Sequence, residues 1–322
     1  MSFAKEVKKE IMGEELADSG EAFAFLSSLF HACGNLNRNS EGITAELVTD
    51  SRELFSYVDK IVKRLYGENL SLGISDDHII NKTIYYRITF PSSISMNILT
   101  DADVIERTGD GLVIKDVPDR NLLCDEKTKI AYLKGAFIGC GTSSIKLSQL
   151  GSKLPTTGYH VEFPSRHKQF LESVQALLAE FNISSKISTR KNIFVLYIKD
   201  SESIKDLLAL LGAVESVFSL SDEMARRGLR NTVNRQVNCI NANISKTVEA
   251  SIKQVEAINL INKKIGLESL PEDLQEVAVL RLANQQESLE ELLKLSTLKL
   301  TKSGLNHRFR RILKIAQLLR GE

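Results

Sequence analysis

EAFAFLSSLFHA at residues 21–32 and IAYLKGAFIG at residues 130–139 are the two stretches on which the fold of this chain depends. Each predicts a compact helix that is ended by a glycine, Gly34 after the first stretch and Gly141 after the second. Two helices can approach more closely where the side chains between them are small. The sequence therefore predicts that these helices form a close pair. The small residues expected between them are Ser27, Ser28, Ala32, Gly135 and Gly139.

The segments after these two helices also repeat. In each copy, a strand that holds a glutamate meets a helix led by a threonine or serine, and an alternating strand and a final helix follow. The glutamates are Glu46 and Glu162, the helix-leading residues are Thr49 and Ser165, and the alternating strands cover residues 84–90 and 193–198. The repeated order predicts two α+β halves that form one pseudo-symmetric domain within residues 21–214.

The C-terminal stretch at residues 288–319, SLEELLKLSTLKLTKSGLNHRFRRILKIAQLL, predicts a different structure. Ser288 is a suitable N-cap for a short helix over residues 289–295, which has acidic residues in its first turn. After a short break, Thr301 or Ser303 can cap a longer helix. A short helix, a turn and a basic helix follow the order of a helix-turn-helix motif. We therefore predict such a motif at about residues 288–319.

The longer helix has an apolar stripe and a basic opposite side. Its apolar residues follow helical spacing, and they are Leu305, Phe309, Ile312, Ala316 and Leu319. The candidate DNA-binding residues are Lys302, Ser303, Asn306, His307, Arg308, Arg310, Arg311 and Lys314. Asn and Arg can pair bidentately with adenine and guanine edges, so we predict that this helix contacts DNA. The alternative is an ordinary solvated helix, in which Asn306 only caps or solvates the helix start.

The polar tract at residues 221–232 predicts a linker between a domain at residues 1–220 and a helical DNA-binding domain at residues 233–322. Residues 234–264 have apolar positions spaced by three or four and predict one or two helices. The first part of this segment is rich in asparagine, a poor helix former that needs polar partners. DNA and the N-terminal domain are equally suitable partners. The candidate DNA-binding residues here are Arg235, Asn238 and Lys246.

Length and composition allow two packed domains, because the chain has 322 residues. The net charge is +1, but residues 222–322 hold 17 Lys and Arg against 12 Asp and Glu, so this part is basic. The N-terminus lacks the pattern of a signal peptide, and no run approaches the roughly 20 apolar residues of a membrane span. The four cysteines show no zinc-binding spacing. We expect a cytoplasmic, nucleoid-associated protein without a metal, a cofactor or a membrane partner.

Several blocks of the sequence resemble known families. Residues 26–34, LSSLFHACG, and residues 133–141, LKGAFIGCG, resemble the two helical motifs of LAGLIDADG homing endonucleases. The whole chain resembles the WhiA family of bacterial regulators, through the blocks MSFAKEVKKEI, AYLKGAFIGCG, NRQVNCINANISKTVEAS, LPEDLQEVAVLR and TKSGLNHRFRRI. The resemblance implies a degenerate, pseudo-symmetric α+β LAGLIDADG domain followed by an all-α helix-turn-helix domain similar to the fourth region of sigma factors. It also implies a DNA-binding transcription regulator of sporulation or cell division.

The same resemblance bears on catalysis. Homing endonucleases hold a divalent metal with an acidic residue at the eighth position of each motif, because a hard cation needs oxygen ligands. Here these positions are Cys33 and Cys140, and a thiol holds magnesium poorly. We expect both to be small buried fillers, with a redox or soft-metal role as the alternative, and we expect no enzyme activity.

These observations predict a sequence-specific regulator that binds double-stranded promoter DNA, with other transcription factors or RNA polymerase as further partners. One alternative is a nucleic-acid endonuclease with a non-standard site. The other is a scaffold that binds a protein or a small ligand and contacts DNA only non-specifically.

Overall fold

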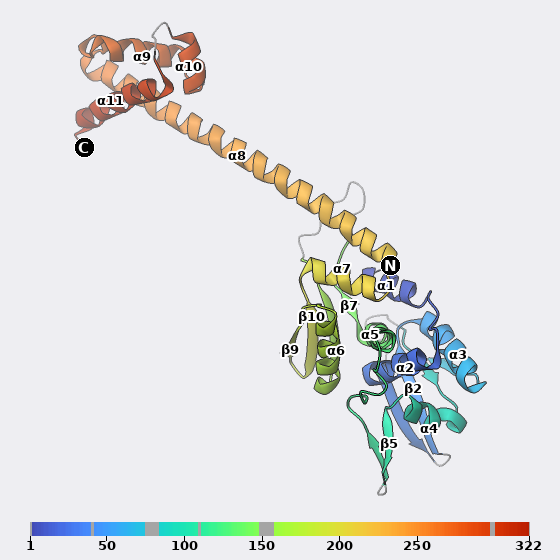
Figure 1. Cartoon of the computed structure of the whole chain (residues 1–322). Coiled ribbons are helices and arrows are strands. Elements are labelled where there is room, and N and C mark those ends of the chain that lie inside the picture. Colours follow the sequence, from blue (N-terminus) through green and yellow to red (C-terminus); the bar gives the residue numbers. More distant parts are fainter. Residues whose placement is uncertain are drawn as a thin grey trace. The chain divides into compact units, whose positions relative to one another are not determined.

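The computed structural model describes residues 2–39, 42–74, 84–108, 111–147, 158–296 and 300–321. Two units can be distinguished, Met1–Arg227 and Gly228–Glu322, and each has its own hydrophobic core. Figure 1 shows the elements of both units along the chain. Each unit is described here by itself.

The first unit opens with α1 (Phe3–Ile11), an amphipathic helix that buries Phe3, Val7 and Ile11. Two halves with the same order of elements follow. The first half consists of α2 (Ser19–Cys33), β1 (Gly34–Asn39), β2 (Gly42–Thr49), α3 (Arg52–Tyr66), β3 (Ser71–Ile74), β4 (Tyr86–Thr89) and α4 (Ser92–Asp101). The second half consists of α5 (Glu126–Cys140), β7 (Thr142–Ser143), β8 (Val161–Ser165), α6 (Lys168–Glu180), β9 (Lys186–Arg190), β10 (Ile193–Ile198) and α7 (Ser201–Leu210).

The two sheets of this unit repeat the same topology. Their strand orders are β1-β2-β4-β3 and β7-β8-β10-β9, and all neighbouring strands are antiparallel. An arginine lies near the strand glutamate in both halves, but the two arginines are on non-equivalent strands. Arg87 of β4 lies 3.7 Å from Glu46 on β2, and Glu162 on β8 accepts hydrogen bonds of 2.9 and 3.1 Å from Arg190 of β9. The predicted pair of pseudo-symmetric α+β halves is therefore confirmed.

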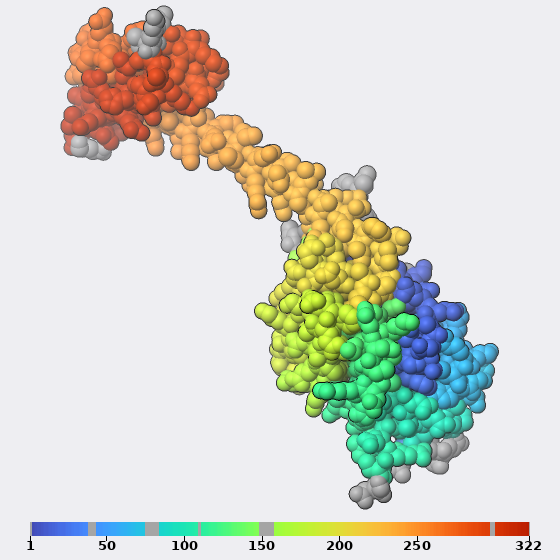
Figure 2. All heavy atoms as spheres, viewed as in Figure 1, coloured from blue at the N-terminus to red at the C-terminus, as the bar shows by residue number. Residues whose placement is uncertain are grey.

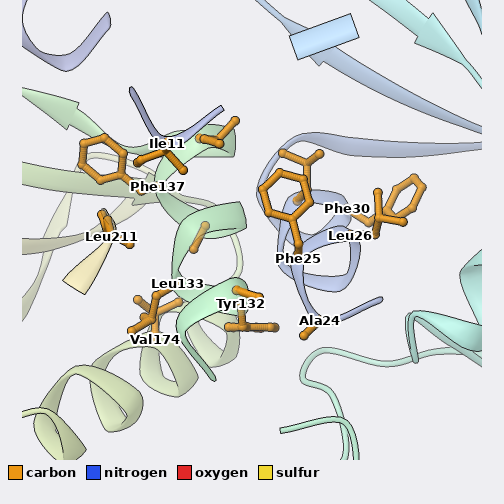
Figure 3. Packing of buried hydrophobic residues seen from close by; sticks show 14 of the residues in the cluster. Ile11, Ala24, Phe25, Leu26, Phe30, Tyr132, Leu133, Phe137, Val174 and Leu211 are labelled. Atoms are coloured by element: carbon orange, nitrogen blue, oxygen red, sulfur yellow. The ribbon is translucent and has the colours of Figure 1, made fainter. Parts of the chain in front are cut away.

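Helices α2 and α5 lie side by side at the centre of the unit, with almost no space between their backbones. A Cβ atom added to Gly135 would lie 2.1 Å from Ser28 Oγ, and one added to Gly139 would lie 2.5 Å from Ala32 Cβ. Ser27 and Ser28 are fully buried. Figure 3 shows the large side chains that surround the pair, including Phe30 of α2 and Phe137 of α5. The predicted close helix pair is confirmed.

Local hydrogen bonds set where these helices begin. The carboxylate of Asp18 accepts from the backbone N–H of Glu21 at the start of α2, and that of Asp125 accepts from the N–H of Thr128 at the start of α5. Thr49 and Ser165 were expected to lead the next helices, and each hydroxyl accepts from the N–H two residues later, at 3.1 Å in both halves. These two residues therefore form matching turns before α3 and α6 and are not the N-caps themselves.

One hairpin of the first unit has no counterpart in the repeat. Strands β5 (Ile105–Thr108) and β6 (Gly111–Ile114) pair antiparallel between the two halves. Ile105 is buried, but the four residues of β6 are exposed. An exposed strand lacks the apolar alternation from which strands are predicted, and this hairpin was not predicted.

The second unit is helical. Helix α8 (Val214–Ile265) starts within the first unit and ends in the second, where η1 (Leu267–Ser269), α9 (Glu272–Ala283), α10 (Leu289–Leu295) and α11 (Lys302–Arg320) follow. Gly266, at φ 75°, ends α8 as expected of a glycine in this position. The core of the unit contains Ile258, Ile261, Leu274, Val277, Ala278, Leu292, Leu305, Phe309 and Ile312.

The predicted linker at residues 221–232 lies inside α8, and the two units divide between Arg227 and Gly228 within it. This tract contains no proline, and a single glycine costs a helix only about 1 kcal/mol, so nothing in it ends the helix. The apolar stripe predicted along α8 is helical but only its last part is buried. Ile258 is fully buried, while Val237, Ile240, Ile244, Val248 and Ile252 are about half exposed.

Candidate nucleic-acid interface

Helices α10 and α11 form the predicted helix-turn-helix. The hydroxyl of Ser288 accepts from the N–H of Glu291 and caps α10, at 3.2 Å. The hydroxyl of Thr301 accepts from the N–H of Gly304 and caps α11, at 3.1 Å, so Thr301 and not Ser303 is the cap. The predicted break between the helices includes residues 297–299, which lie outside the described residues.

The apolar stripe of α11 fixes which side of the helix faces solvent. Leu305, Phe309, Ile312 and Ala316 are buried, and Leu319 is partly buried against the same core. Helix α11 packs against α9 and α10 through this stripe. The space-filling view shows α11, in the darkest red, on the surface of the unit. Its remaining side is therefore available to a partner.

The candidate residues of α11 fall into two groups. The side chains of Ser303, His307, Arg310 and Lys314 are exposed, and within the described residues none of them takes part in an ion pair or a side-chain hydrogen bond. Three of the others are already engaged in ion pairs, and Asn306 is partly buried. Arg308 and Arg311 lie 3.3 and 3.1 Å from the carboxylate of Asp273 on α9, and Lys302 lies 2.6 Å from that of Glu290 on α10. The exposed ion pairs of Lys302 and Arg311 contribute little stability and can be exchanged, whereas Arg308 is partly buried.

A polar groove of about 690 Å³ lies beside the start of α11 and is formed entirely by residues of the second unit. Asn243 and Lys246 of α8 line it together with Lys302 and Asn306 of α11. The structure thus places Lys246, which was predicted on one segment, beside Lys302 and Asn306, which were predicted on another. Arg235 lies eleven residues before Lys246 on the same helix, a rise of about 16 Å, so Arg235 and Asn238 lie away from this groove.

Arg281 on α9 contacts the helix-turn-helix motif and was not identified as functional from the sequence. Its side chain is 2% exposed, its Nε donates to Gln254 Oε1 at 2.9 Å, and its Nη1 donates to the carbonyl oxygen of Glu287 at 2.7 Å. The guanidinium also lies 5.2 Å from the ring centre of Phe309. Burial lowers the pKa of Arg281. One side chain therefore ties α8, the loop before α10, and α11 together.

Arg281 could have been identified from its position in the sequence, because it continues the helical spacing of the buried residues Leu274, Val277 and Ala278 along α9. An arginine on such a stripe must be paired or hydrogen-bonded, since an unpartnered buried charge is very costly. The polar residues of α8 that face the groove, Asn243, Thr247 and Gln254, also share one helical side.

The first unit contains Cys33 and Cys140, the eighth residues of the stretches at 26–34 and 133–141. Cys33 and Cys140 are the last residues of α2 and α5, and each thiol donates to the carbonyl oxygen four residues earlier, at 3.4 Å. Burial raises the pKa of both thiols to about 12. Both are therefore protonated near neutral pH, and a protonated thiol is neither a nucleophile nor a good metal ligand. Within the described residues, no group of three or more His, Cys, Asp and Glu side chains is arranged to hold a metal.

Comparison with known proteins gives matches in both units. The model of the WhiA LAGLIDADG-like domain matches residues 22–85 and 129–230, and the model of the WhiA C-terminal HTH domain matches residues 233–316. A "Probable cell division protein WhiA" from Clostridium tetani is 35% identical, covering 100% of this chain and 99% of the relative. One from Clostridium perfringens is 36% identical, covering 99% of each chain.

A solved structure matches over almost the full length of the chain. The crystal structure of full-length WhiA from Thermotoga maritima matches with a TM-score of 0.58 and 27% identity, covering 98% of both chains. Its likeness supports an N-terminal LAGLIDADG-like domain followed by a helical helix-turn-helix domain. None of the helices in the described residues is long and apolar enough to cross a membrane.

Proposed function

The chain belongs to the WhiA family, and from this premise we propose that it is a sequence-specific transcription regulator that binds double-stranded DNA through α10 and α11. The observation that carries the proposal is the exposed, unpaired side of α11, with Ser303 and Arg310 near its N-terminal half and Lys314 further along. In a helix-turn-helix, the first turns of the second helix face base edges, while later residues meet the backbone. The names of the relatives suggest a role in cell division.

The proposed DNA-binding residues are those predicted from the sequence, with their roles refined by contacts. Asn306, Lys246 and Lys302 border one groove, where they would meet a single stretch of DNA backbone and base edges. Arg308 and Arg311 would contact phosphates only by leaving Asp273, and the cost is modest for the exposed Arg311. Arg235 and Asn238 on α8 would require a separate contact.

We assign residues 1–220 to a non-catalytic domain, residues 221–232 to the junction and residues 233–322 to the DNA-binding domain. The family models support this division, because one match ends at residue 230 and the other begins at residue 233. RNA polymerase or other transcription factors are proposed partners of a regulator of this kind.

The test is specific binding by the full-length protein. Bound sites would be mapped across the genome, and affinities for the recovered promoter fragments would be measured beside scrambled fragments of equal length. At physiological salt, we expect the protein to bind the promoter fragments at least about 1,000-fold more tightly than the scrambled fragments. This ratio is the lower limit for specific recognition. Equal affinity for both kinds of fragment would favour the scaffold that binds DNA only non-specifically.

Supercoiled plasmid carrying a bound site should remain uncut when incubated with the protein and magnesium or manganese. The reason is that neutral thiols stand at the two motif positions where oxygen ligands would hold the metal. Agarose gels of the plasmid over time give the measurement, with a commercial nuclease as the positive control. Nicked or linear product that is absent in EDTA would support the endonuclease alternative.

Changing Lys314 to alanine should lower the affinity for all DNA sequences and flatten the dependence on salt. Each neutralised phosphate contributes about −0.9 to the slope of log K against log salt, so the slope should change by roughly one unit. Fluorescence anisotropy at several salt concentrations measures it. Lys263→Ala, at another exposed lysine of the same unit, should leave the slope unchanged. An unchanged slope for Lys314→Ala would place this residue away from the DNA.

A further inference from the structure

A cavity of about 720 Å³ lies in the first unit, at the end of the central helix pair where α5 finishes. Its walls are the polar side of α1, the turn between β2 and α3, and the turn from α5 into β7. Lys5, Lys8, Asp50, Cys140 and Thr142 are among the lining residues. The volume lies within the range of roughly 300–1,000 Å³ that is typical of small-molecule sites. Neither the DNA-binding helix nor the close helix packing requires such a space.

Lys8 is the unusual group in this cavity. Its side chain is mostly buried, and within the described residues its ammonium takes part in no hydrogen bond or ion pair. Burial lowers the pKa of Lys8, while the charge of Asp50 acts in the opposite direction. The carboxylate of Asp50 lies 3.1 Å from Lys5 and is partly neutralised by it. Lys8 therefore lines the cavity as a poorly solvated cation without a dedicated partner.

The two cysteines near Lys8 do not supply a negative charge, and the nearby carboxylate of Asp50 is paired with Lys5. Cys33 and Cys140 are close enough to interact electrostatically with Lys8, but both thiols are protonated because burial raises the pKa of each to about 12. An ammonium that forms no direct ion pair in a partly buried site is stabilised by an added anion, through Coulomb attraction that is stronger than in bulk water. This end of the helix pair is thus suited to an anion and not to a cation.

We propose that this cavity binds a small phosphate-bearing ligand whose charge is met by the ammonium of Lys8. A lysine serves as a point charge for phosphate, and hydroxyl groups such as that of Thr142 can donate to the remaining oxygens. The carboxylates of Asp50 and Glu53 also line the cavity. The volume of about 720 Å³ is that of a small-molecule site, so a small ligand fits the cavity better than a nucleic-acid strand. The proposal is independent of DNA binding by α11.

The full-length protein provides the test, with inorganic phosphate and adenosine monophosphate as probes at constant ionic strength, maintained with chloride. We expect at least one probe to raise Tm saturably, because a ligand of the native state stabilises it by mass action. Isothermal titration would give the Kd, and competition between the probes would show whether free phosphate and the nucleotide use one site. Tighter binding of the nucleotide would identify a nucleotide-like source of the phosphate.

Lys8→Met should reduce the affinity for the bound probe at least tenfold. The variant is expected to fold, because it removes a partly buried charge and keeps the apolar stem. Lys127→Met, at an exposed lysine near the opposite end of α5, is the matched control and should bind as the unchanged protein does. No saturable binding of either probe would overturn the proposal, and so would equal affinity of the Lys8 variant. A loss of duplex-DNA affinity in Lys8→Met would also overturn it, by showing that the cavity meets the DNA backbone.

Discussion

Gly135→Ala is expected to lower the free energy of unfolding of the N-terminal unit by about 3 kcal/mol, near the upper end for an overpacked core. The new Cβ would lie 2.1 Å from Ser28 Oγ and 2.3 Å from the backbone oxygen of Phe25. Rotation of a side chain can relieve the first contact but not the second. The whole of α2 would have to move away from α5, and the buried residues on both helices would lose contacts.

Urea unfolding followed by circular dichroism gives the measurement, and two further variants interpret it. Gly228→Ala places the same methyl group on α8, where nothing lies within 4 Å, and should be neutral or stabilising by up to about 1 kcal/mol. Ser28→Ala combined with Gly135→Ala should recover only part of the loss, because the carbonyl of Phe25 remains in place. A loss below about 1 kcal/mol for Gly135→Ala would mean that the helices are further apart than the structure shows.

The N-terminal fold could be predicted because its determinants are local and occur twice. Small residues at Ser28 and Gly135 mark the helix contact, and the repeat of strand and helix segments gives two halves with equal strand order. The hairpin of β5 and β6 could not be predicted, because it is exposed and has no second copy. Likewise, the apolar spacing along α8 predicted a helix, but it did not show which of the apolar residues are buried.

The candidate interface was predictable to the same extent. Caps at Ser288 and Thr301 and the buried stripe of α11 follow from spacing within one segment. The ion pairs of Asp273 with two arginines and the burial of Arg281 depend on contacts between helices, which spacing within one segment does not reveal. The groove that places Lys246 beside Asn306 is a tertiary feature of the same kind.

Asn306→Ala and Arg310→Ala are each expected to weaken binding to a specific site by roughly 5- to 150-fold while leaving non-specific binding nearly unchanged. The range corresponds to the 1–3 kcal/mol of discrimination that a bidentate base contact provides, about tenfold per 1.4 kcal/mol. Ser303, Asn306 and Arg310 follow one another at three and four residues and share a side of α11, beside the buried stripe of Leu305.

The two substitutions need different control measurements. Arg310 is exposed, so its loss should not affect stability, whereas Asn306 is half-buried in the groove and its variant requires an unfolding curve beside the binding curve. Gln317→Ala, at an exposed position in the last turns of the same helix, should change neither affinity. Each variant would be measured on a cognate and a scrambled site. Equal losses on both DNAs would mean that this side of α11 only positions the protein on the backbone, because a group that reads bases must distinguish the two sequences.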